Sequence, residues 1–225
     1  MTNGSEPLHP AAQSDLGRQW IAATVASALV GFVMGGIAYA MRQAFDLTSP
    51  NAGVLATLLL FATEIATAVP SFAVYANRTG IVLRAKLPRF PQLTWNALHV
   101  LLGIGLGIVV ASLEMGMGSA SPEADAPASG VVASTAIGGV IAGAMLGAAI
   151  GGLQARVLRK AARAVGLWVG FSALGGTALG LIALTYYVPG DQLVASELQT
   201  LGLGAIIAVI AGVALLPALH RLEPQ

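Results

Sequence analysis

Six long apolar segments, separated by short polar loops, constrain this 225-residue chain more than any other feature. They cover residues 20–41, 53–76, 94–113, 130–155, 166–188 and 199–218. About 20 apolar residues in helical form span the hydrocarbon core of a bilayer. That core offers the backbone no hydrogen-bond partners, so each segment must satisfy its own amides as a helix. The sequence predicts an all-α, polytopic membrane protein with six transmembrane helices.

The composition supports lipid as the solvent. Hydrophobic residues make up 56% of the chain and charged residues only 9%, whereas soluble domains carry about 25% charged residues. The net charge of +1 argues against nucleic acid as a partner. The chain has no Cys, which excludes disulfides, thiolate metal sites and Cys nucleophiles.

The basic residues indicate the direction of each crossing. Ten of the eleven Lys and Arg residues fall on one side of the segments, namely Arg18, Arg78, Arg84, Lys86, Arg89, Arg156, Arg159, Lys160, Arg163 and Arg221. Arg42 is the exception, and it shares the other side with most of the acidic residues. Short loops rich in Lys and Arg stay in the cytoplasm during insertion. We therefore expect a multi-pass membrane protein with both termini in the cytoplasm.

The domain organisation follows from the same pattern. We expect a disordered cytoplasmic tail at 1–18, a transmembrane bundle at 19–219, and a cytoplasmic tail at 220–225. A low-complexity external linker at 114–129 separates two three-helix halves. Ala38-Tyr39-Ala40 has the form of a signal-peptide cleavage site, but the preceding apolar run exceeds the roughly 7–15 residues of a signal peptide. We interpret it as a retained first helix.

The three Trp residues occupy equivalent places. Trp20, Trp95 and Trp168 each begin a segment that follows a basic stretch. Small or polar residues follow the last two at identical spacing, as His99, Gly103 and Gly107 after Trp95, and as Ser172, Gly176 and Gly180 after Trp168. This favours pseudo-repeated helical hairpins. Amphipathic rings commonly settle at headgroup depth, so the expected role of the three indoles is interfacial anchoring.

The second hairpin carries a resemblance. Gly151-Gly152-Leu153-Gln154, Val157-Leu158-Arg159-Lys160, Gly166-Leu167-Trp168 and Ser172-Ala173-Leu174-Gly175 follow one another within roughly 139–182. This run resembles a hairpin of multi-pass bacterial membrane proteins that have no settled activity: a Gly-rich helix, a Gln and Leu-Arg loop, and a helix led by Trp. The resemblance implies topology and bacterial origin, and it implies no activity.

Glycines recur every fourth residue on two segments. Gly139, Gly143, Gly147 and Gly151 share one face of segment 130–155, and Gly31 and Gly35 continue a face of small residues on segment 20–41. Small residues let helix backbones approach closely in lipid. Two uses stay open for these faces: packing within the chain, or association with another subunit.

Polar groups inside the span are the candidate functional residues, because a charge at the bilayer centre costs about 2.5–3.5 kcal/mol on insertion scales. Glu64 is the charge nearest mid-membrane. It begins a polar stripe at helical spacing, and a second stripe lies on segment 94–113. The candidate ion, proton or ligand path consists of Glu64, Thr67, Ser71, Tyr75, Asn96 and His99. Arg42 and Glu114 are the polar residues expected at the outer face, where Arg42 is within reach of Glu114 or Glu64. A protonated, hydrogen-bonded Glu64 with a structural role is the alternative.

The chain carries no Walker A loop and no HExxH motif, so we expect neither an enzyme, nor a metal site, nor a cofactor. Two functions remain. The first is a non-enzymatic integral inner-membrane subunit or scaffold that packs against other membrane components or against itself. The alternative is a small membrane transporter, or its substrate-binding component, with a site around Glu64 between segments 53–76 and 94–113.

Overall fold

The computed structural model describes residues 10–49, 53–118, 129–180 and 193–225. These ranges form long helices and one very short strand pair. The elements are α1 (Pro10–Phe45), α2 (Val54–Lys86), α3 (Gln92–Gly118), α4 (Ser129–Leu158), β1 (Ala162–Arg163), α5 (Gly166–Gly180), α6 (Leu193–Ala214), α7 (Leu216–Arg221) and β2 (Glu223–Pro224).

Five of the described helices are long and apolar enough to cross a membrane. Their spans are Asp15–Phe45, Val54–Lys86, Gln92–Ser112, Ile137–Leu158 and Leu201–Arg221. The fifth predicted segment, 166–188, corresponds to α5, whose description ends at Gly180, and its remainder lies outside the described residues. The fold is therefore all-helical and consistent with a multi-pass membrane protein.

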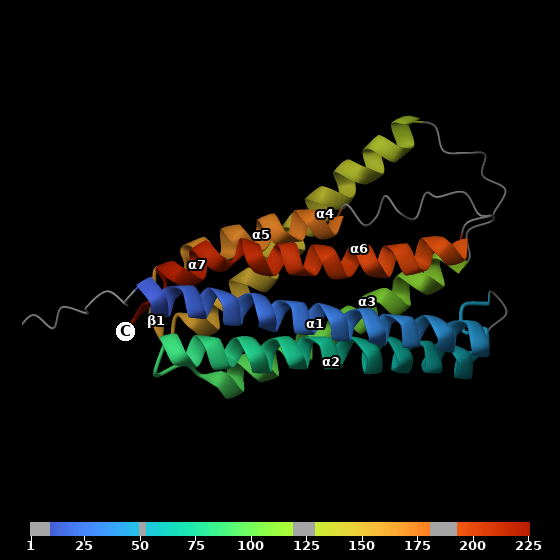
Figure 1. The fold of residues 1–225 in the computed structure, drawn as a ribbon. Helices are drawn as coiled ribbons and strands as arrows, with labels where there is room; N and C mark the ends of the chain where they lie inside the picture. Colours follow the sequence, from blue (N-terminus) through green and yellow to red (C-terminus); the bar gives the residue numbers. More distant parts are fainter. Residues whose placement is uncertain (1–9, 50–52, 119–128, 181–192) are drawn as a thin grey trace, which may run out of the picture.

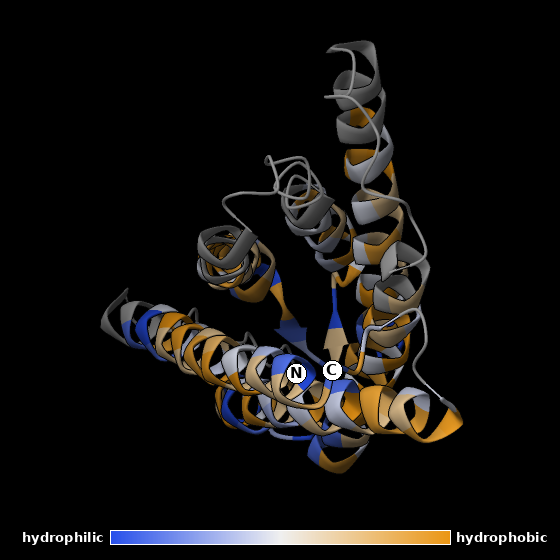
Figure 2. Cartoon of the chain, turned by 90° about the vertical axis from the view of Figure 1, so that its right-hand side faces the viewer, coloured by the Kyte–Doolittle hydropathy of each residue, from blue (hydrophilic) through white to orange (hydrophobic). Residues whose placement is uncertain are grey.

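The long helices run up and down, so that each end of the bundle gathers alternate helix termini (Figure 1). At one end α1, α3 and α5 begin, and α2, α4 and α6 finish. We name this the Trp end, after Trp20, Trp95 and Trp168. The opposite end, marked by Arg42 and Glu64, is the Glu64 end. Viewed from that side, hydrophobic residues predominate along the helices (Figure 2).

The basic residues gather at the Trp end, as the loop pattern requires. Among the described residues, nine of them are exposed there: Arg18, Arg78, Arg84, Arg89, Arg156, Arg159, Lys160, Arg163 and Arg221. Lys86 is half-buried, and its Nζ donates a hydrogen bond of 2.8 Å to the carbonyl oxygen of His220. The ammonium thereby joins the end of α2 to α7.

Several boundaries differ from those expected. α1 begins at Pro10, so residues 10–18 are helical rather than part of a disordered tail. α3 continues to Gly118 and α4 starts at Ser129, so part of the predicted 114–129 linker is helical as well. Hydrophobic continuity marks where a helix crosses lipid, whereas the helix itself extends into polar residues on either side.

The C-terminal residues are held in place rather than forming a free tail. β2 pairs antiparallel with β1, with Ala162 opposite Pro224 and Arg163 opposite Glu223. The backbone N–H of Gln225 donates a hydrogen bond to the Ala161 carbonyl oxygen at 3.1 Å. The loop between α4 and α5 is thus bound to the end of the chain that follows α7.

The glycine faces pack within the chain. A Cβ built on Gly147 would lie 3.0 Å from the Gly176 Cα on α5, and one on Gly35 would lie 2.5 Å from Leu201 Cδ2 on α6. On Gly31 it would lie 3.1 Å from Ser71 Oγ on α2. A Cβ on Gly151 would overlap the Ser172 side chain of α5. These glycines allow close helix contacts that any larger residue would prevent.

Candidate functional site

The centre of the Trp end is filled by the three indoles. Trp20, Trp95 and Trp168 are each 0% exposed. Trp168 meets the other two edge to face, with ring centroids 5.6 Å from Trp20 and 6.2 Å from Trp95. Edge-to-face contact is a favoured geometry for aromatic rings. This corrects the prediction of interfacial anchors: the rings form a core, because mutual packing buries their whole surface while other helices satisfy their N–H groups.

Each indole N–H donates to a different helix. Trp20 Nε1 donates to the Gly212 carbonyl oxygen of α6 at 2.8 Å. Trp95 Nε1 donates to Thr79 Oγ1 of α2 at 3.2 Å, and Trp168 Nε1 donates to Gln154 Oε1 of α4 at 2.8 Å. The three bonds therefore join α1 to α6, α3 to α2 and α5 to α4.

Gln154 also fixes the state of His99. An indole N–H can only donate, so Gln154 Oε1 accepts, and the Gln154 amide nitrogen faces His99 Nε2 at 3.0 Å. The amide nitrogen also only donates, so His99 Nε2 must accept. The ring proton then lies on Nδ1 and donates to the Trp95 carbonyl oxygen at 2.8 Å. Both nitrogens are occupied, so His99 links α3 and α4 and offers no open nitrogen to a proton or metal.

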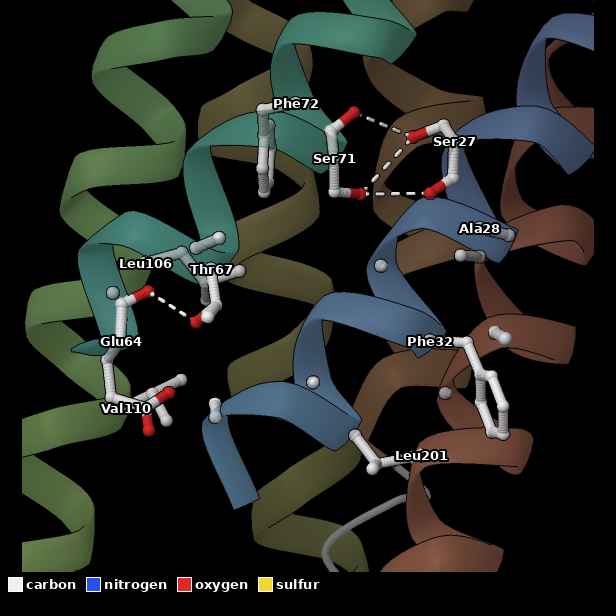
Figure 3. A pocket seen from close by; sticks show the side chains of 18 of the residues that line it. Ser27, Ala28, Phe32, Glu64, Thr67, Ser71, Phe72, Leu106, Val110 and Leu201 are labelled. Atoms are coloured by element: carbon white, nitrogen blue, oxygen red, sulfur yellow. Dashed lines mark hydrogen bonds between the residues drawn. The ribbon is translucent and has the colours of Figure 1, made fainter. Parts of the chain in front are cut away.

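A cavity of about 390 Å³ opens towards the Glu64 end, between α1, α2, α3 and α6. We name it the ion-pair cavity, because Arg42 and Glu64 line it and form a salt bridge of 2.5 Å between Nη1 and Oε1. Glu64 is only 6% exposed. Figure 3 shows Glu64 and Thr67 on α2 opposite Phe32 and Leu201. Most of the remaining lining is apolar, so this pair provides the cavity's only side-chain charges among the described residues.

A second cavity of about 330 Å³ lies towards the Trp end. We name it the hydroxyl cavity, because Thr24, Tyr75 and Ser172 line it, together with Gln154 and His99. The two cavities adjoin, since both are lined by Ser27, Ser71, Phe72, Leu106 and Ala208. Polar side chains therefore lie in both cavities and at the region that the two share.

Two serines lie where the cavities meet. Ser27 Oγ donates to the Ser71 carbonyl oxygen at 2.9 Å, and Ser71 Oγ donates to the Ser27 carbonyl oxygen at 3.1 Å (Figure 3). The reciprocal bonds hold α1 against α2. Each hydroxyl uses its proton on a backbone acceptor, so the junction is narrow, uncharged and hydrogen-bonded.

One buried hydroxyl of the hydroxyl cavity has no partner. Ser172 Oγ is buried and makes no hydrogen bond within the described part of the chain. The Ser172 side chain packs closely against α4, where a Cβ on Gly151 would lie 2.6 Å from the hydroxyl oxygen. An unsatisfied buried hydroxyl is unfavourable, and native proteins rarely keep one without a reason.

The structure brings most of the sequence-predicted path together. Glu64 and Thr67 line the ion-pair cavity, Tyr75 and His99 line the hydroxyl cavity, and Ser71 lines both. Asn96 lines neither, and its Oδ1 is buried without a hydrogen-bond partner among the described residues.

The two outer-face residues have different outcomes. Arg42 reaches Glu64, which was one of its two expected partners. The Glu114 side chain lies outside the described residues.

Sequence reasoning missed four lining residues: Thr24, Ser27, Gln154 and Ser172. Gln154 and Ser172 entered the sequence analysis through the resemblance, and Ser172 also through the spacing after Trp168, but neither was considered a lining residue. Thr24, Ser27 and Ser172 lie one or two helical turns after a Trp, and Gln154 lies on the helix paired with that of Trp168.

Comparison with known proteins adds no relative. No family model matches the chain, no curated protein matches it, and no solved structure matches it.

Proposed function

We propose that this protein is a small membrane transporter whose path runs through the ion-pair cavity and the hydroxyl cavity. One observation carries the proposal: the two cavities share the lining residues Ser27 and Ser71, and they lie between helices that are apolar enough to cross a membrane. Ligand sites in helical membrane proteins lie between helices, at the few places where polar groups converge.

The polar groups along this path have distinct roles in the proposal. Arg42 and Glu64 stay paired and offer a solute in the ion-pair cavity a guanidinium donor and a carboxylate acceptor for hydrogen bonds. Ser27 and Ser71 form the junction that the solute must pass. Tyr75 and Ser172 then offer hydroxyls that can donate or accept, and the Thr24 hydroxyl, which donates to the Trp20 carbonyl oxygen, can accept. Movement of α1 relative to α2 would open the junction by breaking the two serine bonds.

The proposed orientation places the Trp end in the cytoplasm of a bacterial inner membrane, with both chain termini on that side. The cluster of exposed Arg and Lys at this end supports it, because such residues are retained inside during insertion. We also propose that the predicted segment 166–188, which begins with α5, crosses the membrane as a sixth helix. The same proposal includes a threefold pseudo-repeat of the pairs α2–α3, α4–α5 and α6–α1, supported by the three indole bonds that join them.

Cysteine accessibility tests the transport path, since the chain has no Cys and each introduced thiol is unique. Ser71→Cys is the test variant, and Leu59→Cys is the matched control on the same helix, where Leu59 is 43% exposed outside both cavities. Only a hydrated thiol ionises and reacts with a charged methanethiosulfonate reagent.

We expect Ser71→Cys in oriented membrane vesicles to react with the impermeant reagent added to either face, and Leu59→Cys to stay unmodified. A transporter exposes its site to both sides in turn, so access from both faces is the required result. Reaction at the rate of Leu59→Cys from either side would contradict a path through the junction.

A scaffold is the second candidate, favoured by α4. Its apolar residues Ile137, Ile141 and Met145 are 54–68% exposed, and its N-terminal half leans away from the other helices (Figure 1). A partner helix or a second copy would cover them. Oxidation of Met145→Cys in membranes tests the second copy: a disulfide-linked dimer supports it, and monomer alone contradicts it.

A further inference from the structure

We propose that the hydroxyl cavity binds a small uncharged molecule that carries a hydroxyl or amide group, held by Ser172 and Tyr75. This inference rests on the proposed transport function for its biological meaning and names the class of solute. The site itself can be measured without transport.

The charge of the lining sets the charge of the ligand. No Asp, Glu, Lys or Arg lines the hydroxyl cavity among the described residues. Its one imidazole, His99, has both nitrogens bonded to Gln154 and the Trp95 carbonyl. A charged ligand would lose its hydration here and gain no opposite charge, which is strongly unfavourable. The nearest charges, Arg42 and Glu64, line the ion-pair cavity and are bonded to each other.

Two hydroxyls supply the hydrogen bonds. Ser172 Oγ is buried and unpartnered on one wall. The Tyr75 hydroxyl makes no hydrogen bond with the described residues, although its ring is held firmly, with centroids 5.3 Å from His99 and 6.1 Å from Trp20. A hydroxyl both donates and accepts, so the pair suits a ligand group that does the same, an alcohol or an amide. Binding would satisfy groups that the fold alone leaves unsatisfied.

The volume and the remaining walls set the body of the ligand. A cavity of about 150 Å³ accommodates benzene, so about 330 Å³ leaves room for a ring and its substituent. The rest of the lining is apolar and includes Phe72, Leu106 and Ile150. The ligand therefore combines a compact apolar body with one uncharged polar group.

A matched series of probes tests this selection. Benzyl alcohol, benzoate and benzylamine share one ring and differ in the charge of the attached group. The reporter is Ala208→Cys in the purified full-length protein, because Ala208 lines both cavities. At about ten times its dissociation constant, benzyl alcohol should slow methanethiosulfonate modification of this thiol roughly tenfold. Benzoate and benzylamine at equal concentration should leave the rate unchanged. Equal protection by either ion, or none by benzyl alcohol, would overturn the proposal.

Removal of the two hydroxyls separates binding from structure. Ser172→Ala and Tyr75→Phe, each combined with Ala208→Cys, should raise the dissociation constant of benzyl alcohol roughly tenfold, the value of one hydrogen bond, as measured from the concentration dependence of protection. Ser172→Ala should also keep or raise the thermal stability, because it deletes an unsatisfied buried group. Ser112→Ala, which loses only an exposed bond to its own helix, is the matched control and should change neither property.

Unchanged affinity in Ser172→Ala would contradict the assigned site. The outcome is distinguishable from failure of the transport function. Selective protection by benzyl alcohol, with Ser71→Cys reachable from one face only, would establish the binding site and reject transport. Access from both faces, with equal protection by a charged probe, would do the reverse.

Discussion

The Trp end and the Glu64 end of the bundle are built from the same kind of helix but differ in what occupies the centre. At the Trp end, three buried indoles contact one another and bond to three further helices. At the Glu64 end, the centre is a cavity beside the Arg42–Glu64 salt bridge, and the buried hydrophobic cluster among the described residues there consists of Leu47, Leu60 and Ala111. The difference indicates that close packing is concentrated at the Trp end, whereas the Glu64 end is packed more loosely around its cavity.

Contacts between sequence-adjacent helices are equally close at both ends, and the largest expected effects test this. Cβ atoms on Gly147 and Gly107 would meet the backbone of the neighbouring helix, 2.6 Å from Ile65 Cα in the second case. Gly147→Leu and Gly107→Leu should both abolish assembled protein, measured by detergent size-exclusion chromatography. Gly152→Leu and Gly105→Leu are the matched controls, because nothing lies within 4 Å of a Cβ there. Normal assembly of either test variant would refute the close contacts.

The next largest effect should arise in the aromatic core. Trp168→Leu removes two ring contacts and leaves Gln154 Oε1 without its donor, so the free energy of unfolding should fall by roughly 3–5 kcal/mol. Denaturant titration of the purified protein measures it. Trp168→Phe keeps a ring and should cost less. Leu167→Ala, one residue away and 39% exposed, should have little effect. Similar losses for Leu167→Ala and Trp168→Leu would mean that the indoles do not carry stability at this end.

Loss of the salt bridge should cost less than loss of an indole. Glu64→Gln removes the carboxylate from the salt bridge with Arg42, and a hydrogen bond to a charged group contributes roughly 1.5–3 kcal/mol. A double-mutant cycle with Arg42→Gln isolates the pair, and a positive coupling energy is expected from denaturant titrations. Additive effects would show that the two residues are independent. A coupling larger than the effect of Trp168→Leu would reverse the comparison between the two ends.

The smallest effect should come from the junction between the cavities. Ser27→Ala removes one of two reciprocal bonds and should lower the free energy of unfolding by about 1 kcal/mol. It should also speed methanethiosulfonate modification of Ala208→Cys, because α1 and α2 then separate more easily. A stability loss without faster modification would make the serine pair a structural contact alone.

The sequence was sufficient for what lipid and helix geometry decide. Continuous apolar stretches predicted the five described helices that are long and apolar enough to cross a membrane, and the loops predicted the end where the basic residues gather. The period of the stripe from Glu64 to Tyr75 predicted one polar face of α2, and that face lines both cavities. The reach of Arg42 towards Glu64 was predicted from its place near the end of the first segment.

The sequence did not allow us to predict which helices lie side by side in the bundle. A Trp at the start of an apolar helix suits the headgroups and a buried core equally, and only the position of the other helices decides between them. The bond between His99 and Gln154 joins residues 55 apart in sequence, and the bond from Trp20 to Gly212 joins residues 192 apart. Helical periodicity specifies which side of a helix a residue occupies, but it does not specify which helix faces that side.

The bond from Trp20 to Gly212 also has a consequence for biogenesis. α1 leaves the ribosome well before α6, yet it carries an indole N–H whose acceptor belongs to α6. Until α6 enters the bilayer, that donor and the ring around it lack their native surroundings. Insertion of the early helices and closure of the bundle are therefore separate events in time, and a chain stalled before α6 should be a substrate for membrane quality control.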